Sequence, residues 1–125
     1  VGVRSLSEKE YKFIEEVDLP VYFWHNETPN ITQLAKKILH KLSKNVYISI
    51  DLDVLDVSLM SAVGTPEPGG ITWIEILYLL KTIASERQIV GFDLTELSPM
   101  EGPESCAFTA AKLAYKLIGY STYKN

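Results

Sequence analysis

The segment from Asn45 to Gly70 constrains the fold of this chain more than any other. It opens with an apolar, β-branched run at 46–50, which is typical of a strand buried on both faces of a parallel sheet. The run leads into Asp51 and Asp53, and residues two apart project from the same face of an extended strand. We therefore expect these two carboxylates to converge at the carboxyl end of the strand.

A loop rich in proline and glycine follows the two acids, with the sequence Gly-Thr-Pro-Glu-Pro-Gly-Gly at 64–70. The prolines restrict φ and the glycines permit tight or left-handed turns, so this loop is expected to have one firmly defined shape. A rigid loop beside two convergent carboxylates predicts a site for a hard divalent cation.

The rest of the chain alternates between strand-like and helix-like patterns. The predicted elements are a strand end at 1–3, a helix from the Ser7 cap to Glu16, a strand at 21–24, and a helix from Thr28-Pro29-Asn30 to Leu42. After the central strand come a helix at 73–85 capped by Thr72, a strand at 89–94 and a helix at 104–119. This order predicts an α/β fold with a mainly parallel sheet.

The topology has a consequence for the acidic residues. Ligands of open parallel sheets bind beyond the carboxyl ends of the strands. Asp51 and Asp53 follow one strand, and Glu96 follows the next strand along the chain. We therefore expect three acids at the same rim of the sheet.

Composition limits the classes of partner. The chain has 125 residues, which suits one small domain, and its net charge of −4 argues against nucleic acid. The longest apolar stretch, at 74–80, contains Glu75 and is too short to span a bilayer. The start of the chain does not resemble a signal peptide, and the single cysteine, Cys106, cannot form an internal disulfide. We expect a cytoplasmic protein without nucleic-acid or membrane partners.

Several motifs carry a family resemblance. The sequence Ser-Ile-Asp-Leu-Asp at 49–53, followed by the loop at 64–70, resembles the C-terminal signature of the ureohydrolases, the arginase/agmatinase family. The segments 91–99 and 109–113 resemble the agmatinase branch, and the segment 1–5 resembles a stretch that precedes these blocks there. The resemblance covers nearly the whole chain.

The resemblance implies a three-layer α/β/α fold with two Mn²⁺ ions that share a hydroxide. The hydroxide attacks a guanidinium carbon and releases urea and an amine, as in the conversion of agmatine to putrescine. By position, Asp51 would bridge both metals, Asp53 would bind one of them, and Glu96 would bind the substrate guanidinium. Carboxylates suit Mn²⁺, and a guanidinium matches a carboxylate in a bidentate pair.

One departure from the family pattern is large. The family's other metal ligands and a catalytic histidine lie in upstream Gly-Gly-Asp-His and Asp-Ala-His-x-Asp blocks, which this sequence lacks; its histidines are His25 and His40. Two carboxylates alone hold a cation pair poorly. We therefore expect residues 1–125 to be the C-terminal part of one ureohydrolase domain, inactive alone, with weak or no Mn²⁺ binding. The implied partners are copies of itself, as family trimers or hexamers, or a missing N-terminal half.

Three alternatives accompany this interpretation. Asp93 either supports a metal ligand by a hydrogen bond or makes a purely structural one. A second hypothesis, in place of the hydrolase, is a non-catalytic domain that has kept the fold, lost the chemistry and binds a partner. An Asp-x-Asp after an apolar strand is also typical of phosphoryl-transfer enzymes, but those need a later lysine and a second acidic pair. Lys81 falls within a predicted helix and no adjacent Asp pair follows, so this last hypothesis is the weakest.

Overall fold

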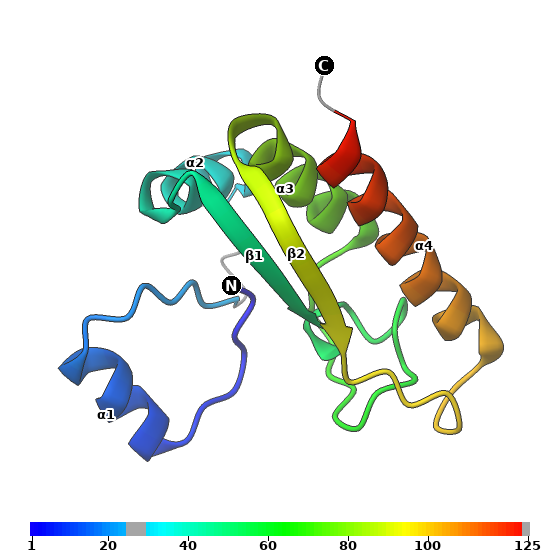
Figure 1. The fold of residues 1–125 in the computed structure, drawn as a ribbon. Helices are drawn as coiled ribbons and strands as arrows, with labels where there is room; N and C mark the ends of the chain where they lie inside the picture. The colour runs from blue at the N-terminus through cyan, green and yellow to red at the C-terminus, as the bar shows by residue number, and fades with distance from the viewer. Residues whose placement is uncertain (25–29, 124–125) are drawn as a thin grey trace.

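The computed structural model describes residues 1–24 and 30–123, and Figure 1 shows their arrangement. Its elements in chain order are α1 (Glu8–Glu16), α2 (Ile31–Lys41), β1 (Asn45–Asp51), the short 3₁₀ helix η1 (Leu52–Val54), α3 (Trp73–Glu86), β2 (Gln88–Thr95) and α4 (Glu104–Thr122). The predicted α/β class with a parallel sheet is confirmed, because β1 and β2 pair in parallel.

The outer strands are shorter than predicted. The expected strands at 1–3 and 21–24 are reduced to one parallel bridge between Val3 and Phe23. The amide of Trp24 donates to the carbonyl of Val3 at 2.8 Å beside this bridge. Asn30 caps α2 by accepting a hydrogen bond from the Thr32 amide. The predicted helix start at 28–29, and His25, lie outside the described residues.

The sheet is open on one face, which corrects the expectation that β1 is buried on both faces. Val46 and Ile50 of β1 are buried in the core, whereas Tyr47 between them is 62% exposed. Val90 of β2 is also 62% exposed. The described residues thus supply a sheet with a core on one face only, and the second outer layer of the expected three-layer arrangement is not among them.

The core lies between the inner sheet face and the helices. In Figure 1, α3 and α4 run side by side, and contacts join α4 to β2 and α2 to α3. Leu52, Leu113 and Leu117 are fully buried there. By contrast, α1 stands apart in Figure 1 and buries no side chain. Of the helices in the described ranges, none combines the length and apolar character that crossing a membrane requires.

Both predicted helix caps, Ser7 and Thr72, are present, and each forms a capping box. Glu10 accepts from the Ser7 amide at 2.7 Å at the start of α1, and Glu75 accepts from the Thr72 amide at 2.9 Å at the start of α3. Each pair satisfies backbone donors that the first turn of a helix leaves unpaired. The cap at Thr72 fixes where the chain leaves the proline- and glycine-rich loop and enters α3.

Two neighbouring positions on α4 test the packing of this helix. Leu117 is fully buried and Ile118 is 52% exposed. Leu117→Ala should lower the free energy of unfolding by about 2–5 kcal/mol, because it removes buried methyl groups and leaves a cavity. Ile118→Ala should cost at most about 1 kcal/mol, because much of its surface already contacts water. Urea unfolding followed by circular dichroism measures both values, and equal losses would contradict the observed orientation of α4.

Candidate functional site

Asp51 and Asp53 meet at the carboxyl end of β1, although not by strand alternation. Asp51 is the last residue of β1, and Asp53 lies in η1, where the backbone has already left the extended conformation. Burial raises the pKa of Asp51, and the negative charge of Asp53 and a hydrogen bond between the two side chains raise it further. The expected convergence is therefore present, and the 3₁₀ turn produces it.

Glu96 lies at the same rim. Its charge also contributes to the raised pKa of Asp51, which places the two carboxylates within electrostatic reach of each other. Its backbone is left-handed, with φ of +69°, a conformation that costs a non-glycine residue about 1 kcal/mol. Such backbone conformations concentrate at functional sites.

The proline- and glycine-rich loop closes over this rim. A Cβ atom at Gly64 would lie 3.8 Å from Glu96 Oε2, so the start of the loop faces that carboxylate. The Thr65 hydroxyl donates to Asp53 Oδ2 at 3.0 Å. The sequence predicted a rigid loop beside the acids, but nothing in it indicated that Thr65 would orient one of them.

Asp56 anchors the far end of the loop. Its carboxylate accepts from the amides of Gly69 at 2.7 Å and Gly70 at 3.2 Å, and from the Ser58 amide at 3.0 Å. Hydrogen bonds from Ser58, followed by those from the two glycines, lower the pKa of this carboxyl. The loop is thus attached at both ends to the residues that directly follow β1, which accounts for its defined shape.

Asp93 lies on the open face of the sheet, opposite Ser49 in the parallel register. Its carboxylate accepts from the hydroxyls of Tyr47 at 2.7 Å and Ser49 at 2.8 Å. These bonds lower the pKa of Asp93, while the bond to Asp93 raises the pKa of Tyr47. Two residues further along the strands, on the same face of the sheet, Asp51 pairs with Thr95, so this network ends just before the acidic rim.

The donor set fits part of a metal site. In residues 1–24 and 30–123, no group of three or more His, Cys, Asp or Glu side chains could hold a metal ion. Asp51 and Asp53 nevertheless offer hard oxygen ligands whose mutual repulsion a cation would relieve. These two residues fit a divalent cation as a partial ligand set, and Glu96 adds a third charge at the rim.

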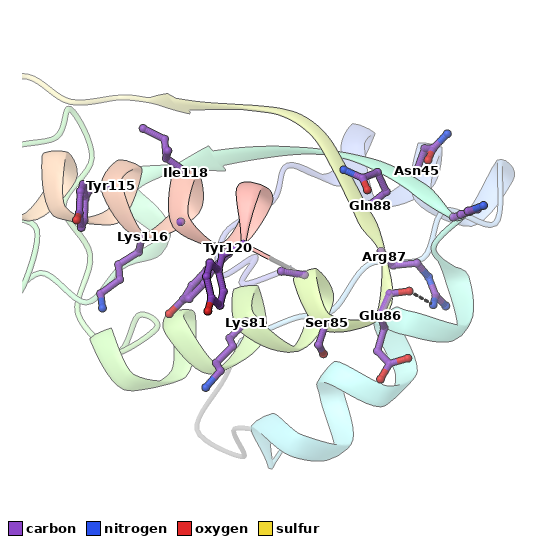
Figure 2. Close-up of a pocket in the computed structure, with 14 residues that line it drawn as sticks. Asn45, Lys81, Ser85, Glu86, Arg87, Gln88, Tyr115, Lys116, Ile118 and Tyr120 are labelled. Carbon is purple, nitrogen blue, oxygen red and sulfur yellow. Dashed lines mark hydrogen bonds between the residues drawn. The ribbon is translucent and has the colours of Figure 1, made fainter. Parts of the chain in front are cut away.

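A separate cavity of about 1030 Å³ lies at the other end of the strands (Figure 2). Its lining includes Asn45 and Gln88, the first residues of β1 and β2, together with Lys81, Arg87 and Tyr120. A seven-residue strand such as β1 spans roughly 20 Å. The cavity is therefore remote from the acids and takes no part in their chemistry.

The electrostatics of the rim can be tested through stability. The pKa of Asp51 is raised on folding, so its ionisation destabilises the fold as pH rises through that pKa. Asp51→Asn should therefore increase the free energy of unfolding at pH 7, by up to about 1 kcal/mol at so solvent-accessible a site. The gain should vanish below about pH 4, where the carboxyl is protonated in both states.

Asp93→Asn is the matched control with the opposite sign. The pKa of Asp93 is lowered on folding, so its charged form stabilises the fold above the ordinary aspartate pKa. Its replacement should lower the free energy of unfolding at pH 7, and this loss should fade as pH falls. Urea titrations at pH 7 and below about pH 4 measure the change in the free energy of unfolding for both variants. A change of the same sign in Asp51→Asn and Asp93→Asn at pH 7 would contradict the assigned hydrogen bonds and charges.

Comparison with known proteins gives a consistent result. The sequence matches the arginase family model over residues 1–119. It is 36% identical to the N(1)-aminopropylagmatine ureohydrolase of Synechocystis sp. over 120 residues, which are 96% of this chain and 39% of that protein. It is 33% identical to the agmatinase of Pyrococcus horikoshii, covering 96% of this chain and 41% of that protein.

Solved structures show the same likeness in the fold. Arginase from Bacillus subtilis superposes with a TM-score of 0.86 at 32% identity, covering 94% of this chain and 44% of that chain. The agmatine ureohydrolase of Thermoplasma volcanium gives a TM-score of 0.79 at 30% identity, covering 96% and 40%. This chain spans about 40% of the length of the curated relatives that it matches. Since the family model extends over nearly all of its residues, the chain belongs to the arginase family.

Proposed function

We propose that residues 1–125 are the C-terminal part of one ureohydrolase domain, which hydrolyses a guanidino group to urea and an amine. The observation that carries this proposal is the meeting of Asp51, Asp53 and Glu96 at the carboxyl rim of the sheet, in a chain of the arginase family. The favoured substrate is agmatine, which would give putrescine.

Asp51 and Asp53 would hold Mn²⁺ through their carboxylate oxygens. When bound, the ion pair would supply a water of lowered pKa as the nucleophile. Within this chain, the Thr65 hydroxyl bonded to Asp53 Oδ2 holds that carboxylate in one orientation. Asp93, fixed by Tyr47 and Ser49, would stabilise the end of β1 from which Asp51 projects.

Glu96 would bind the substrate guanidinium through a bidentate, charge-assisted pair. Its exposed side chain leaves the carboxylate open to a ligand, and the neighbouring acids add attraction for a cation. Curated relatives named for agmatine or N(1)-aminopropylagmatine are 32–38% identical to this chain, and the arginases of Schizosaccharomyces pombe are 27–28% identical. Among the curated relatives these values favour a guanidino amine without an α-carboxylate, whereas the two solved structures, an arginase at 32% and an agmatine ureohydrolase at 30%, do not separate the substrates.

The remaining ligands and the catalytic histidine would come from a further polypeptide portion, within a homo-oligomer of the trimeric or hexameric family type. A second candidate function is a non-catalytic interaction domain. One observation favours it for the isolated chain: the described residues lack a group of three metal-ligating side chains. The hydrolase should release urea once the remaining portion of the fold is supplied, whereas an interaction domain should not.

Complementation separates these functions. The chain is co-expressed with the part of the Synechocystis relative that it does not match, and urea release is assayed with Mn²⁺ on agmatine, N(1)-aminopropylagmatine and arginine. We expect no activity from either part alone, and activity of the pair on the two decarboxylated substrates. A stable but inactive pair would support the interaction domain.

Glu96→Gln in the active pair tests the role of this carboxylate. It should lower kcat/KM by about 10- to 150-fold, since a charged hydrogen-bond pair contributes about 1.5–3 kcal/mol.

Metal content tests the assignment of Asp51 and Asp53. In the same complemented protein, Asp51→Asn or Asp53→Asn should remove tight binding of at least one Mn²⁺ ion per site, because a carboxylate ligand is lost. Elemental analysis after dialysis measures the stoichiometry. Glu86→Gln, which alters an acid at the far end of α3, is the control and should leave it unchanged. Full metal occupancy in both aspartate variants would refute the ligand assignment.

A further inference from the structure

Arg4 joins two segments that are far from it in sequence, the turn that carries Asp53 and the loop that closes over the acidic rim. Its Nη1 donates to the carbonyl of Glu67 at 3.0 Å, and its Nη2 donates to the carbonyl of Asp53. Its Nε lies 3.7 Å from Glu67 Oε2, so the same guanidinium is also paired with that carboxylate. The Arg4 side chain is only 9% exposed, which makes these contacts its principal environment.

One of the two carbonyls that Arg4 binds belongs to Asp53, and the other belongs to Glu67, in the loop that hydrogen-bonds to the Asp53 side chain. Asp53 is itself a rim carboxylate, and Thr65, two residues before Glu67, donates to Asp53 Oδ2 at 3.0 Å. Pro66 and Pro68 flank Glu67 and restrict φ, so a constraint on Glu67 extends to its neighbours. Arg4 therefore restrains the backbone under the Asp53 carboxylate and the loop that orients it.

The loop leaves space for this guanidinium at Gly70. A Cβ atom there would lie 2.5 Å from Arg4 Nη1, and equally close to backbone atoms of Leu55 and Asp56. Any larger residue at 70 would displace either the guanidinium or the chain. The requirement for glycine at this position is an observation independent of the hydrogen bonds, and it places Arg4 against the backbone of the loop.

We propose that Arg4 is a positioning residue for the acidic rim, which fixes the direction of the Asp53 carboxylate through its backbone and through Thr65. Its relevance to catalysis rests on the proposed function. A planar guanidinium presents several donors in a rigid fork and can bind two carbonyls and a carboxylate at once, whereas a lysine ammonium is a single point charge. Arg4→Lys thus keeps the charge and removes the fork.

The chain provides a matched control in its other arginine, Arg87. Its guanidinium donates to three carbonyls, those of Leu39, Leu42 and Glu86, at the opposite end of the sheet. Figure 2 shows Arg87 there, beside the separate cavity. Arg87→Lys makes the same chemical change away from the rim, so any effect of losing an arginine fork in general appears in both variants.

Hydrogen exchange by mass spectrometry on the full chain measures the effect of each substitution. We expect Arg4→Lys to speed exchange at least about tenfold in segments 52–56 and 64–70, because charged hydrogen bonds are lost there. Exchange around 39–42 should stay unchanged. Arg87→Lys should give the reverse pattern. Unchanged exchange at 52–56 and 64–70 in Arg4→Lys, or a uniform increase over the whole chain, would overturn the proposal.

A measurement on the unsubstituted chain covers the case in which Arg4→Lys does not fold. In ¹H–¹⁵N NMR spectra, the Nη groups of Arg4 should give separate signals and a nuclear Overhauser contact to the Gly70 α protons. A single averaged Nη signal without that contact would overturn the proposal.

Mn²⁺ titration of the same chain tests whether Arg4 affects the proposed metal site. Millimolar Mn²⁺ should broaden the amide signals of Asp51, Asp53 and Thr65, and Arg4→Lys should reduce the broadening at Asp53 at least about threefold. Absence of broadening in the unsubstituted chain would agree with a site that needs the remaining ligands, and the exchange result would then decide on Arg4. Normal broadening in Arg4→Lys would overturn the positioning role.

Discussion

Repulsion among three carboxylates is the constraint on which the arrangement of this rim depends. Asp51, Asp53 and Glu96 lie close enough for the latter two to raise the pKa of Asp51. Without a cation, like charges in such proximity favour separation or protonation. The fold opposes separation by three means: the 3₁₀ turn that directly follows β1, the left-handed backbone at Glu96, and the loop that lies against both. A site that retains this arrangement is suited to a positively charged occupant.

The means of opposing repulsion are themselves polar contacts between distant segments. The Thr65 hydroxyl donates a hydrogen bond to the Asp53 carboxylate, Arg4 brings a nearly buried positive charge to the Asp53 backbone, and Asp56 attaches the glycine end of the loop. A single hydrogen bond contributes only about 1 kcal/mol. Several that share the same short loop restrain it together, because loosening one leaves the others in place. The rigidity expected from proline and glycine thus depends equally on these anchors.

Local rules predicted the elements and the grouping of the acids, but they could not predict the contacts that orient them. Helix caps at Ser7 and Thr72 located the starts of α1 and α3, and strand order placed Glu96 beside Asp51. The reason given for Asp51 and Asp53 to converge was wrong in detail, since Asp53 has already left the strand. Arg4 contacts residues 49 and 63 positions away, and no pattern in a single sequence indicates a pairing at that separation.

The open face of the sheet and the partial set of metal ligands meet at the same place, the carboxyl end of β1. Every second residue of β1 lies on its exposed face: Tyr47, Ser49 and Asp51. The uncovered surface of the sheet therefore continues to the acidic rim. Exposed apolar side chains on a sheet favour a further packed layer, and Tyr47 and Val90 supply them here. A polypeptide that covered this face along the whole of β1 would reach Asp51. A further layer on the open face of the sheet would therefore lie next to the candidate metal ligands.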